Sequence, residues 1–410
     1  MFKRTGHGLN LTSIFLICPI PVSMDIYPVC TFNCLYCFGK ASVSKKNRTK
    51  LNTPKPETLD NFLTKHLAEV PKELNQEEKF VKWYIHNRKA VQIGVVSDPF
   101  DFLEYKYGYT YDILQVFSKH HYPIRLSTKG VLYAKNKYLK LFRENKDVWK
   151  LGVSLFTKDE ETLANVEKNG FSYNKRLKAI RKAVNNGIDV VVRFGPYIPG
   201  INEDYEEIMA DLHDAGVKDF QLRNFEKSPF LTNAEKKNYE KLNQISKIDL
   251  NKFCKNHMSK ERHGELSYTK SVAYTKKFRK IAEKYGMNFY TQNDPARVHG
   301  LSENCCAVKE DFILKDYNLC SALFVAKEKG EVHYEDVAKN FNHLLGDIPT
   351  ANTCFFTESK KLVHLKDLFQ NAWNNPKSRR GLCKRFGYHL LPDRIDENGN
   401  IVYKIDEKRL

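Results

Sequence analysis

The chain has 410 residues, of which 41% are hydrophobic and 28% are charged. This composition allows a sizeable buried core with a charged surface, and it excludes a disordered chain, a collagen-like fibre and a membrane-embedded protein. Lys and Arg number 67 against 49 Asp and Glu, which gives a formal net charge of +18. Such an excess favours a polyanionic partner, such as nucleic acid, a phosphorylated substrate or an anionic membrane surface.

The first residues, MFKRTGHGLNLTSIFLICPIP, resemble a secretory signal because basic residues precede an apolar run. The run at 14–18 is too short, however, prolines follow it, and no small-residue cleavage site comes after them. No stretch approaches the roughly 18 to 20 apolar residues of a membrane span. Ten unevenly spaced cysteines are too sparse for a disulfide scaffold. We therefore expect a cytoplasmic protein, with no membrane partner, whose thiols bind metal.

Strands and helices alternate regularly from residue 90 to about 225, and one further strand is expected near 23–29. Short runs rich in β-branched residues predict strands at 23–29, 91–96, 123–128, 150–156, 188–200 and 218–225. Between them, apolar residues recur every three to four positions, which predicts helices at 109–121, 134–145, 175–187 and 204–216. Gly187 and Gly216 stand where helix C-caps belong. This repetition is typical of βαβ units with a parallel sheet.

Six such units close naturally as an open or partial barrel, although a doubly wound sheet would give the same pattern. After residue 230 the alternation fades, with helices expected at 232–246 and 270–285. Residues 296–410 contain five of the ten cysteines and no βα repeat. We therefore predict a core at 1–295 and a separate, basic C-terminal extension at 296–410.

The strongest motif is YPVCTFNCLYCFGK, in which Cys30, Cys34 and Cys37 have the spacing CxxxCxxC. Chance placement at this cysteine content would give about 0.006 occurrences. Three thiolates on one short loop can supply three of the four ligands of a structural zinc, or hold a four-iron cluster with one iron left open. No clean second CxxC pair follows, and catalytic loops of β/α folds emerge after strands, so we favour the cluster.

With Tyr36 directly before the last cysteine, the motif resembles the radical S-adenosylmethionine (radical SAM) superfamily, whose hallmark is CxxxCxΦC with an aromatic residue at that position. The resemblance is best over residues 15–225. It implies an α/β fold, a partial (β/α)6 barrel, and a [4Fe–4S] cluster whose open iron binds S-adenosylmethionine (SAM). Reductive cleavage of SAM would give a 5′-deoxyadenosyl radical that abstracts hydrogen, with a flavodoxin- or ferredoxin-type electron donor.

The resemblance implies further SAM contacts. GVVSDPFDFLE is similar to the Ser-Asp-Pro variant of the spore photoproduct lyase-like branch, so Ser97 and Asp98 are expected to face the methionine end of SAM. Ser154 on the fourth strand would meet the carboxylate or ribose, Ile198 after the fifth would pack on adenine, and Asn224 on the sixth would lie at the adenine edge. If these residues do not contact SAM, Ser154 is an ordinary hydroxyl of the core, and the turn at Ile198 has a structural role alone.

Two basic runs without acids, 39–50 and 376–385, favour a nucleic acid or nucleotide substrate, for repair or modification, although charge runs are usually solvated faces. The lyase-like branch includes an enzyme that reverses a thymine lesion in DNA. That enzyme has another cysteine downstream of its motif that returns a hydrogen atom. This chain has no cysteine between Cys37 and Cys254, so that role would fall to Cys254 or a C-terminal thiol.

The segment NDPARVHGLSENCC places His299 close to Cys305 and Cys306, and Cys320 follows fourteen residues later. This loose spacing predicts a second iron–sulfur cluster or a zinc site, or else a set of buried apolar cysteines. The remaining cysteines are assigned either to completing that site (Cys354 or Cys383) or to the core (Cys18 and Cys254).

Two alternatives to radical chemistry on nucleic acid stay open. The first keeps the radical SAM class but acts on a peptide or a small metabolite. The second is a non-enzymatic, zinc-bound nucleic-acid-binding protein, which iron and sulfide analysis would separate from both enzymes.

Overall fold

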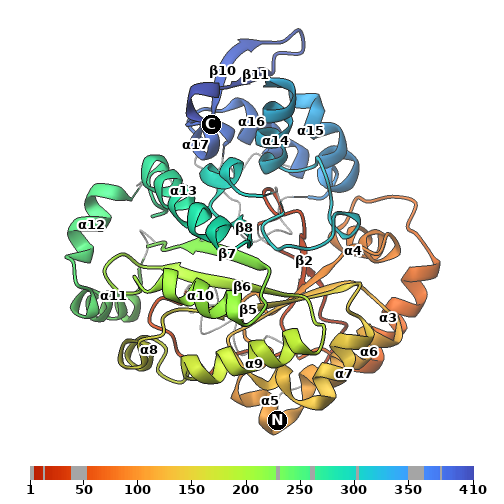
Figure 1. The fold of residues 1–410 in the computed structure, drawn as a ribbon. Coiled ribbons are helices and arrows are strands. Elements are labelled where there is room, and N and C mark those ends of the chain that lie inside the picture. Colours follow the sequence, from red (N-terminus) through yellow and green to blue (C-terminus); the bar gives the residue numbers. More distant parts are fainter. Residues whose placement is uncertain are drawn as a thin grey trace.

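The computed structural model describes residues 4–12, 14–37, 53–227, 231–258, 264–301, 304–349, 364–378 and 381–410. A central eight-stranded sheet is covered on its outer face by helices (Figure 1). Its strands are β1 (Asn10–Leu11), β2 (Val22–Met24), β3 (Val91–Ile93), β4 (Ile124–Thr128), β5 (Trp149–Leu155), β6 (Val190–Tyr197), β7 (Asp219–Asn224) and β8 (Asn288–Thr291).

The order of the strands in the sheet is their order in the chain, from β1 to β8. β1 pairs antiparallel with β2, and every following pair is parallel. A doubly wound sheet would reverse its strand order at a switch point. The sequential order therefore confirms the predicted α/β partial barrel.

The six predicted strands correspond to β2–β7, and β8 is a seventh parallel strand that the sequence analysis did not count. In the described part of the chain, three helices separate β7 from β8, and this long insertion breaks the strand–helix rhythm on which the prediction relied. The first strand is shorter than predicted, because β2 ends at Met24 and residues 25–29 already lead into the cysteine loop.

The helices around the barrel follow the apolar periodicity, and the six predicted helices match within two residues at each end. They are α3 (Pro56–Ala68), α4 (Glu77–His86), α5 (Phe102–Tyr107), α6 (Tyr109–Lys119), α7 (Asn136–Glu144), α8 (Glu160–Val166), α9 (Tyr173–Asn185), α10 (Tyr205–Asp214), α11 (Asn233–Ile245), α12 (Leu250–His257) and α13 (Tyr268–Lys284). Gly187 and Gly216 follow α9 and α10 with φ of 73° and 77°, the left-handed conformation expected after a helix end.

The C-terminal part gathers at one end of the molecule, at the top of Figure 1. It contains α14 (Leu319–Lys329), α15 (Tyr334–Phe341), α16 (Leu365–Asn374), α17 (Leu382–Phe386) and a small antiparallel sheet of β9 (Glu331–Val332), β11 (Ile401–Ile405) and β10 (Leu390–Ile395). One continuous apolar cluster reaches from Leu9 to Tyr403, so this part packs on the barrel. The boundary between 295 and 296 stays a prediction. Within the described ranges, no helix combines the length and apolarity that crossing a bilayer requires.

Glu104 fastens α5 and α6 to the first part of the barrel. The side chain is buried and accepts hydrogen bonds from the hydroxyls of Tyr27 and Tyr138. The backbone N–H groups of Thr110 (2.8 Å) and Tyr111 (3.1 Å) donate to the same carboxylate. Because all four groups donate, the side chain at position 104 must accept every one of these hydrogen bonds. This position therefore requires a carboxylate.

Replacing Glu104 with Gln should lower the free energy of unfolding by about 1 to 3 kcal/mol, because the new amide N–H2 would face donors instead of acceptors. Urea denaturation followed by circular dichroism measures the change. Glu144→Gln is the control: this acid lies exposed on α7, 3.9 Å from Lys140, and its change should stay within about 0.5 kcal/mol. Equal denaturation midpoints for the two variants would contradict the role of Glu104.

Candidate functional site

A hollow with a cavity volume of about 140 Å³ opens among the loops that follow the parallel strands. The cysteine loop after β2 forms one wall, and the turn after β3 together with the last residues of β4 to β7 forms the rest. Loops at the carboxyl ends of barrel strands are the usual place of catalytic residues in β/α barrels. This hollow is therefore the candidate active site.

The structure brings most of the residues that were predicted to bind the loop cluster or SAM into the lining of this hollow. The lining contains Cys30, Cys34, Cys37, Tyr36, Ser97, Asp98, Ser154 and Asn224. Ile198 does not line it: this side chain is fully buried in the core, and its N–H donates to Asn202 at 2.8 Å. Its contact with adenine stays a prediction that the described lining does not support.

The three loop cysteines differ in exposure, with Cys34 buried, Cys37 half-buried and Cys30 exposed. Burial, together with the nearby Glu167 carboxylate, raises the pKa of Cys34 well above its usual range. This thiol stays protonated at neutral pH until a metal displaces the proton. Within the described ranges, no three His, Cys, Asp or Glu side chains are arranged to hold a single metal ion.

A buried ion pair fastens the cysteine loop to the end of α8. The hydroxyl of Tyr36 donates to Glu167, and the Glu167 carboxylate lies 2.5 Å from the Arg176 guanidinium, with both charges buried. Burial opposes ionisation of Glu167, but the charges of Arg176 and Lys129 outweigh it and lower its pKa. The N–H of Leu35 also donates to the carbonyl of the last α8 residue at 2.9 Å. The loop is thus fixed to the barrel by one buried carboxylate.

A second acid holds the start of the same loop. The Asp101 carboxylate accepts the backbone N–H of Thr31 at 2.9 Å and its hydroxyl at 3.1 Å. The side chain of Asn169 donates to the carbonyl of Thr31 at 2.7 Å. Burial raises the pKa of Asp101 to about 6, although the Thr31 and Leu103 N–H groups act in the opposite direction. The cysteine loop is therefore anchored to a buried acid both before and after its second cysteine, Cys34.

The Ser-Asp-Pro turn is shaped by Asp25, which directly follows β2. One carboxylate oxygen of Asp25 accepts three successive backbone N–H groups, from residues 95, 96 and 97, at 2.9 to 3.0 Å. Gly94 has φ of 81°, and a Cβ there would lie 2.5 Å from the carbonyl oxygen of Ser127. The turn can therefore close only with glycine at this position.

Asp98 uses its carboxylate to join the turn to the end of β4. It accepts the hydroxyl of Thr128 at 2.6 Å and the backbone N–H groups of Lys129 and Phe100 at 2.6 and 2.9 Å. This acid is buried, and burial raises its pKa. Its observed contacts organise the wall of the hollow, and a direct contact with SAM stays a prediction.

Several polar atoms of the wall are buried and lack a hydrogen-bond partner among the described residues. They are the Ser127 hydroxyl, the Asn224 side-chain oxygen and one guanidinium nitrogen of Arg193. Lys129 and Arg223 add two further cations to the lining. Buried polar atoms are normally paired, so the hollow is shaped for a polar ligand. Asn224 was predicted from the sequence as a site residue, whereas Ser127 and Arg193 were not.

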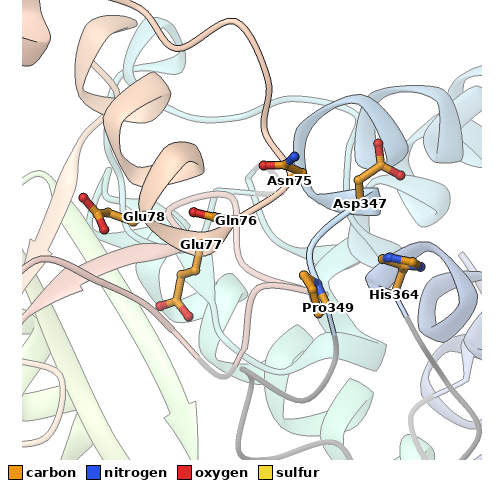
Figure 2. Close-up of a pocket in the computed structure, with 7 residues that line it drawn as sticks. All are labelled: Asn75, Gln76, Glu77, Glu78, Asp347, Pro349 and His364. Carbon is orange, nitrogen blue, oxygen red and sulfur yellow. The ribbon is translucent and has the colours of Figure 1, made fainter.

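A second pocket lies elsewhere, between the start of α4 and the segment after α15 (Figure 2). Its acids are already engaged: Glu77 accepts the N–H of Leu11, Glu78 pairs with Lys82, and Asp347 pairs with Lys366. The described residues that line this pocket include no cysteine. We therefore assign the chemistry to the hollow beside the cysteine loop.

The basic runs are only partly visible. The run at 39–50 lies outside the described residues, and so do Arg379 and Arg380 of the second run. Lys384 and Arg385 lie on α17, and both side chains are half-buried. Contact of either run with nucleic acid stays a prediction.

Known proteins resemble the part of the chain around this hollow. Residues 24–212 match the family model of the Radical SAM superfamily. A curated relative, the uncharacterized protein ORF301 of Acidianus two-tailed virus, is 29% identical over 153 residues, which are 36% of this chain and 50% of the relative. The match thus spans about half the length of that relative.

Similar solved structures include a spore photoproduct lyase double mutant with bound AdoMet and dinucleoside spore photoproduct, at 15% identity and a TM-score of 0.47. That comparison covers 67% of this chain and 76% of the lyase chain. Streptococcus suis SuiB bound to S-adenosylmethionine is 12% identical with a TM-score of 0.42, over 70% of this chain and 54% of SuiB.

Replacing Tyr36 with Phe tests the fastening of the loop. The variant removes the hydroxyl that joins the loop to the buried Glu167, and a hydrogen bond to a charged group is worth about 1.5 to 3 kcal/mol. A reconstituted cluster should therefore be lost to a chelator at least about tenfold faster, measured as bleaching of its visible absorption.

Tyr133→Phe is the matched control for this variant. The hydroxyl of Tyr133 is buried and has no partner among the described residues, so its removal should leave the bleaching rate unchanged. Identical bleaching of the two variants would show that Tyr36 does not hold the loop.

Proposed function

We propose that this chain, whose residues 24–212 belong to the radical SAM superfamily, is an enzyme that cleaves SAM reductively and acts on a nucleic acid or nucleotide. The observation that carries the proposal is the placement of Cys30, Cys34 and Cys37 in one hollow with the ends of four parallel strands. When bound, the [4Fe–4S] cluster and SAM would supply a 5′-deoxyadenosyl radical for hydrogen abstraction. The unpaired buried atoms of the hollow fit a ligand as polar as SAM.

The residues of this chain would hold the cluster and SAM in place and shield the radical from water. The three thiolates would bind the cluster, with Tyr36 and Thr31 anchoring their loop to buried acids. Ser97, Ser154 and Asn224 would orient SAM from three different strand ends. The rigidity of this wall matters because a radical must meet its substrate before water or the protein quenches it.

The substrate assignment rests on charge. Lys129, Arg193 and Arg223 all line the hollow, in a chain with a net charge of +18. Cations at the mouth of a site attract phosphate groups and raise the local concentration of a polyanion. We therefore place repair or modification of nucleic acid ahead of a peptide or small-metabolite substrate.

The proposal includes a flavodoxin- or ferredoxin-type protein as electron donor and the cytoplasm as location. A one-electron donor is needed because SAM is cleaved by reduction. None of the nine cysteines among the described residues is in a disulfide bond.

The direct test is a Cys30→Ala, Cys34→Ala, Cys37→Ala variant. Anaerobically reconstituted wild-type protein should convert SAM to 5′-deoxyadenosine and methionine when reduced, and the variant should not, as measured by chromatography of the products. Cys254→Ala, a thiol on α12 away from the hollow, is the control and should retain the activity. SAM cleavage by the triple variant would overturn the assignment.

Nucleic-acid binding is tested by salt dependence. Neutralising Lys45, Lys46 and Arg48, next to the cysteine loop, should flatten the plot of log affinity against log salt by up to about 0.9 for each phosphate group that the variant no longer binds. The measurement is oligonucleotide binding by fluorescence anisotropy between low and moderate salt.

The control removes the same charge from exposed residues of α9, which covers the outer face of the sheet: Lys175, Lys178 and Lys182. This variant should keep the wild-type slope. A slope that is unchanged in the first variant would assign the run at 39–50 to a solvated surface.

A further inference from the structure

The amino end of the barrel, opposite the candidate SAM hollow, is covered by the segment 304–314. The N–H of Ala90, just before β3, donates to the carbonyl of Phe312 at 2.8 Å. The N–H of Leu314 donates to the carbonyl of Pro19 at 3.0 Å, and the side chain of Gln221 on β7 donates to the carbonyl of Cys305. The segment is thus tied to β3, β7 and the chain before β2.

Three thiols meet under this cover. The sulfur atoms of Cys305 and Cys306 lie 3.9 Å apart. Cys18 belongs to the same small buried cluster, whose other members are apolar: Ile20, Ala90, Val308 and Ile313. Each of the three cysteines is less than a tenth exposed. A group of three cysteines has therefore been assembled from two ends of the chain.

An arginine of the barrel interior acts on these thiols. Arg125 on β4 is fully buried, and none of its three guanidinium nitrogens has a hydrogen-bond partner among the described residues. Gly152 gives it room, because a Cβ there would lie 2.6 Å from the guanidinium. The hydrogen bond from the Cys305 thiol, followed by the charge of Arg125, lowers the pKa of Cys306.

A buried cation without an acceptor is strongly destabilising, so the arrangement calls for an anionic group that can accept N–H bonds. We propose that Cys18, Cys305 and Cys306 hold a second iron–sulfur cluster at the amino end of the barrel, with Arg125 donating to its sulfur atoms. Such a cluster combines thiolate ligands, a negative charge and sulfides that accept hydrogen bonds, and an apolar shell suits it.

The proposed ligand set differs from the one that the sequence spacing suggested. Cys320 begins α14, its side chain belongs to the main apolar core, and its N–H donates to Asn318 at 2.9 Å. Cys18 takes the place given to Cys320. His299 contacts His389 edge to face, with ring centres 5.3 Å apart. Cys354 lies outside the described residues. The side-chain oxygen of Gln92, 4.0 Å from the Cys306 sulfur, is the polar atom placed to complete the site.

The test starts from the full-length Cys30→Ala, Cys34→Ala, Cys37→Ala variant, which lacks the ligands of the first cluster. After anaerobic reconstitution and desalting, it should retain iron and acid-labile sulfide in near-equal amounts. Adding Cys18→Ala, Cys305→Ala and Cys306→Ala should remove both. The matched control adds instead Cys254→Ala, Cys320→Ala and Cys383→Ala, and should retain both.

A folded starting variant without iron, or one that holds zinc without sulfide, overturns the proposal. So does retention of iron and sulfide after Cys18, Cys305 and Cys306 are removed. None of these results bears on SAM cleavage by the first cluster, which is measured separately in the wild-type protein.

Arg125→Met gives an independent readout that keeps every thiol. Loss of an outer hydrogen-bond partner weakens metal affinity by about 10- to 100-fold, so iron retention by the starting variant should fall accordingly. The thermal midpoint of the metal-free protein should stay the same or rise, because a buried unpaired charge is removed. Unchanged iron retention would contradict the proposed contact.

Discussion

The buried pair of Glu167 and Arg176 is the interaction on which the candidate site depends. Two charges withdrawn from water are tolerable only together, and removing one partner of such a pair costs about 3 to 5 kcal/mol. Tyr36 completes this arrangement through its hydroxyl and thereby joins the cysteine loop to it. The loop cannot move away from the barrel without leaving a buried carboxylate short of a donor.

The topology of the barrel brings the anchored cysteine loop together with the other parts of the site. Because the parallel strands follow one another in chain order, their carboxyl ends form one continuous edge, and the side chains after each strand face a common space. Asp25 and Asp98 then use their carboxylates on backbone N–H groups, which fixes the turn after β3 and the end of β4. The carboxylates of these acids hold the backbone in place. The Ser127 hydroxyl and the Asn224 side-chain oxygen have no partner among the described residues and can bind a ligand.

The sequence predicted what depends on short-range patterns. Strand–helix alternation gave the partial barrel, and the spacing of Cys30, Cys34 and Cys37 selected the loop. The strand β8 was missed because three helices interrupt the alternation. Glu167 was missed for another reason: its role depends on contacts with residues 131 positions before it and nine positions after it.

Long-range contacts also explain the differences among the other cysteines. Cys18 was assigned to the core because nothing within its neighbourhood in sequence suggests a ligand, yet the fold places it beside Cys305 and Cys306. Arg125 gives no signal in the sequence either, since an arginine within a β-strand is ordinary. Only its full burial without acceptors distinguishes it, and burial is a property of the assembled barrel.

The central claim is that the cysteine loop presents one open iron to SAM inside the hollow. Electron paramagnetic resonance of the reduced, reconstituted protein, recorded with and without SAM, tests it most directly. We predict that SAM changes the spectrum of the loop cluster, and that SAM labelled with ¹⁵N at its amino group shows a magnetic coupling to that cluster. A spectrum that is identical with and without bound SAM would contradict the claim.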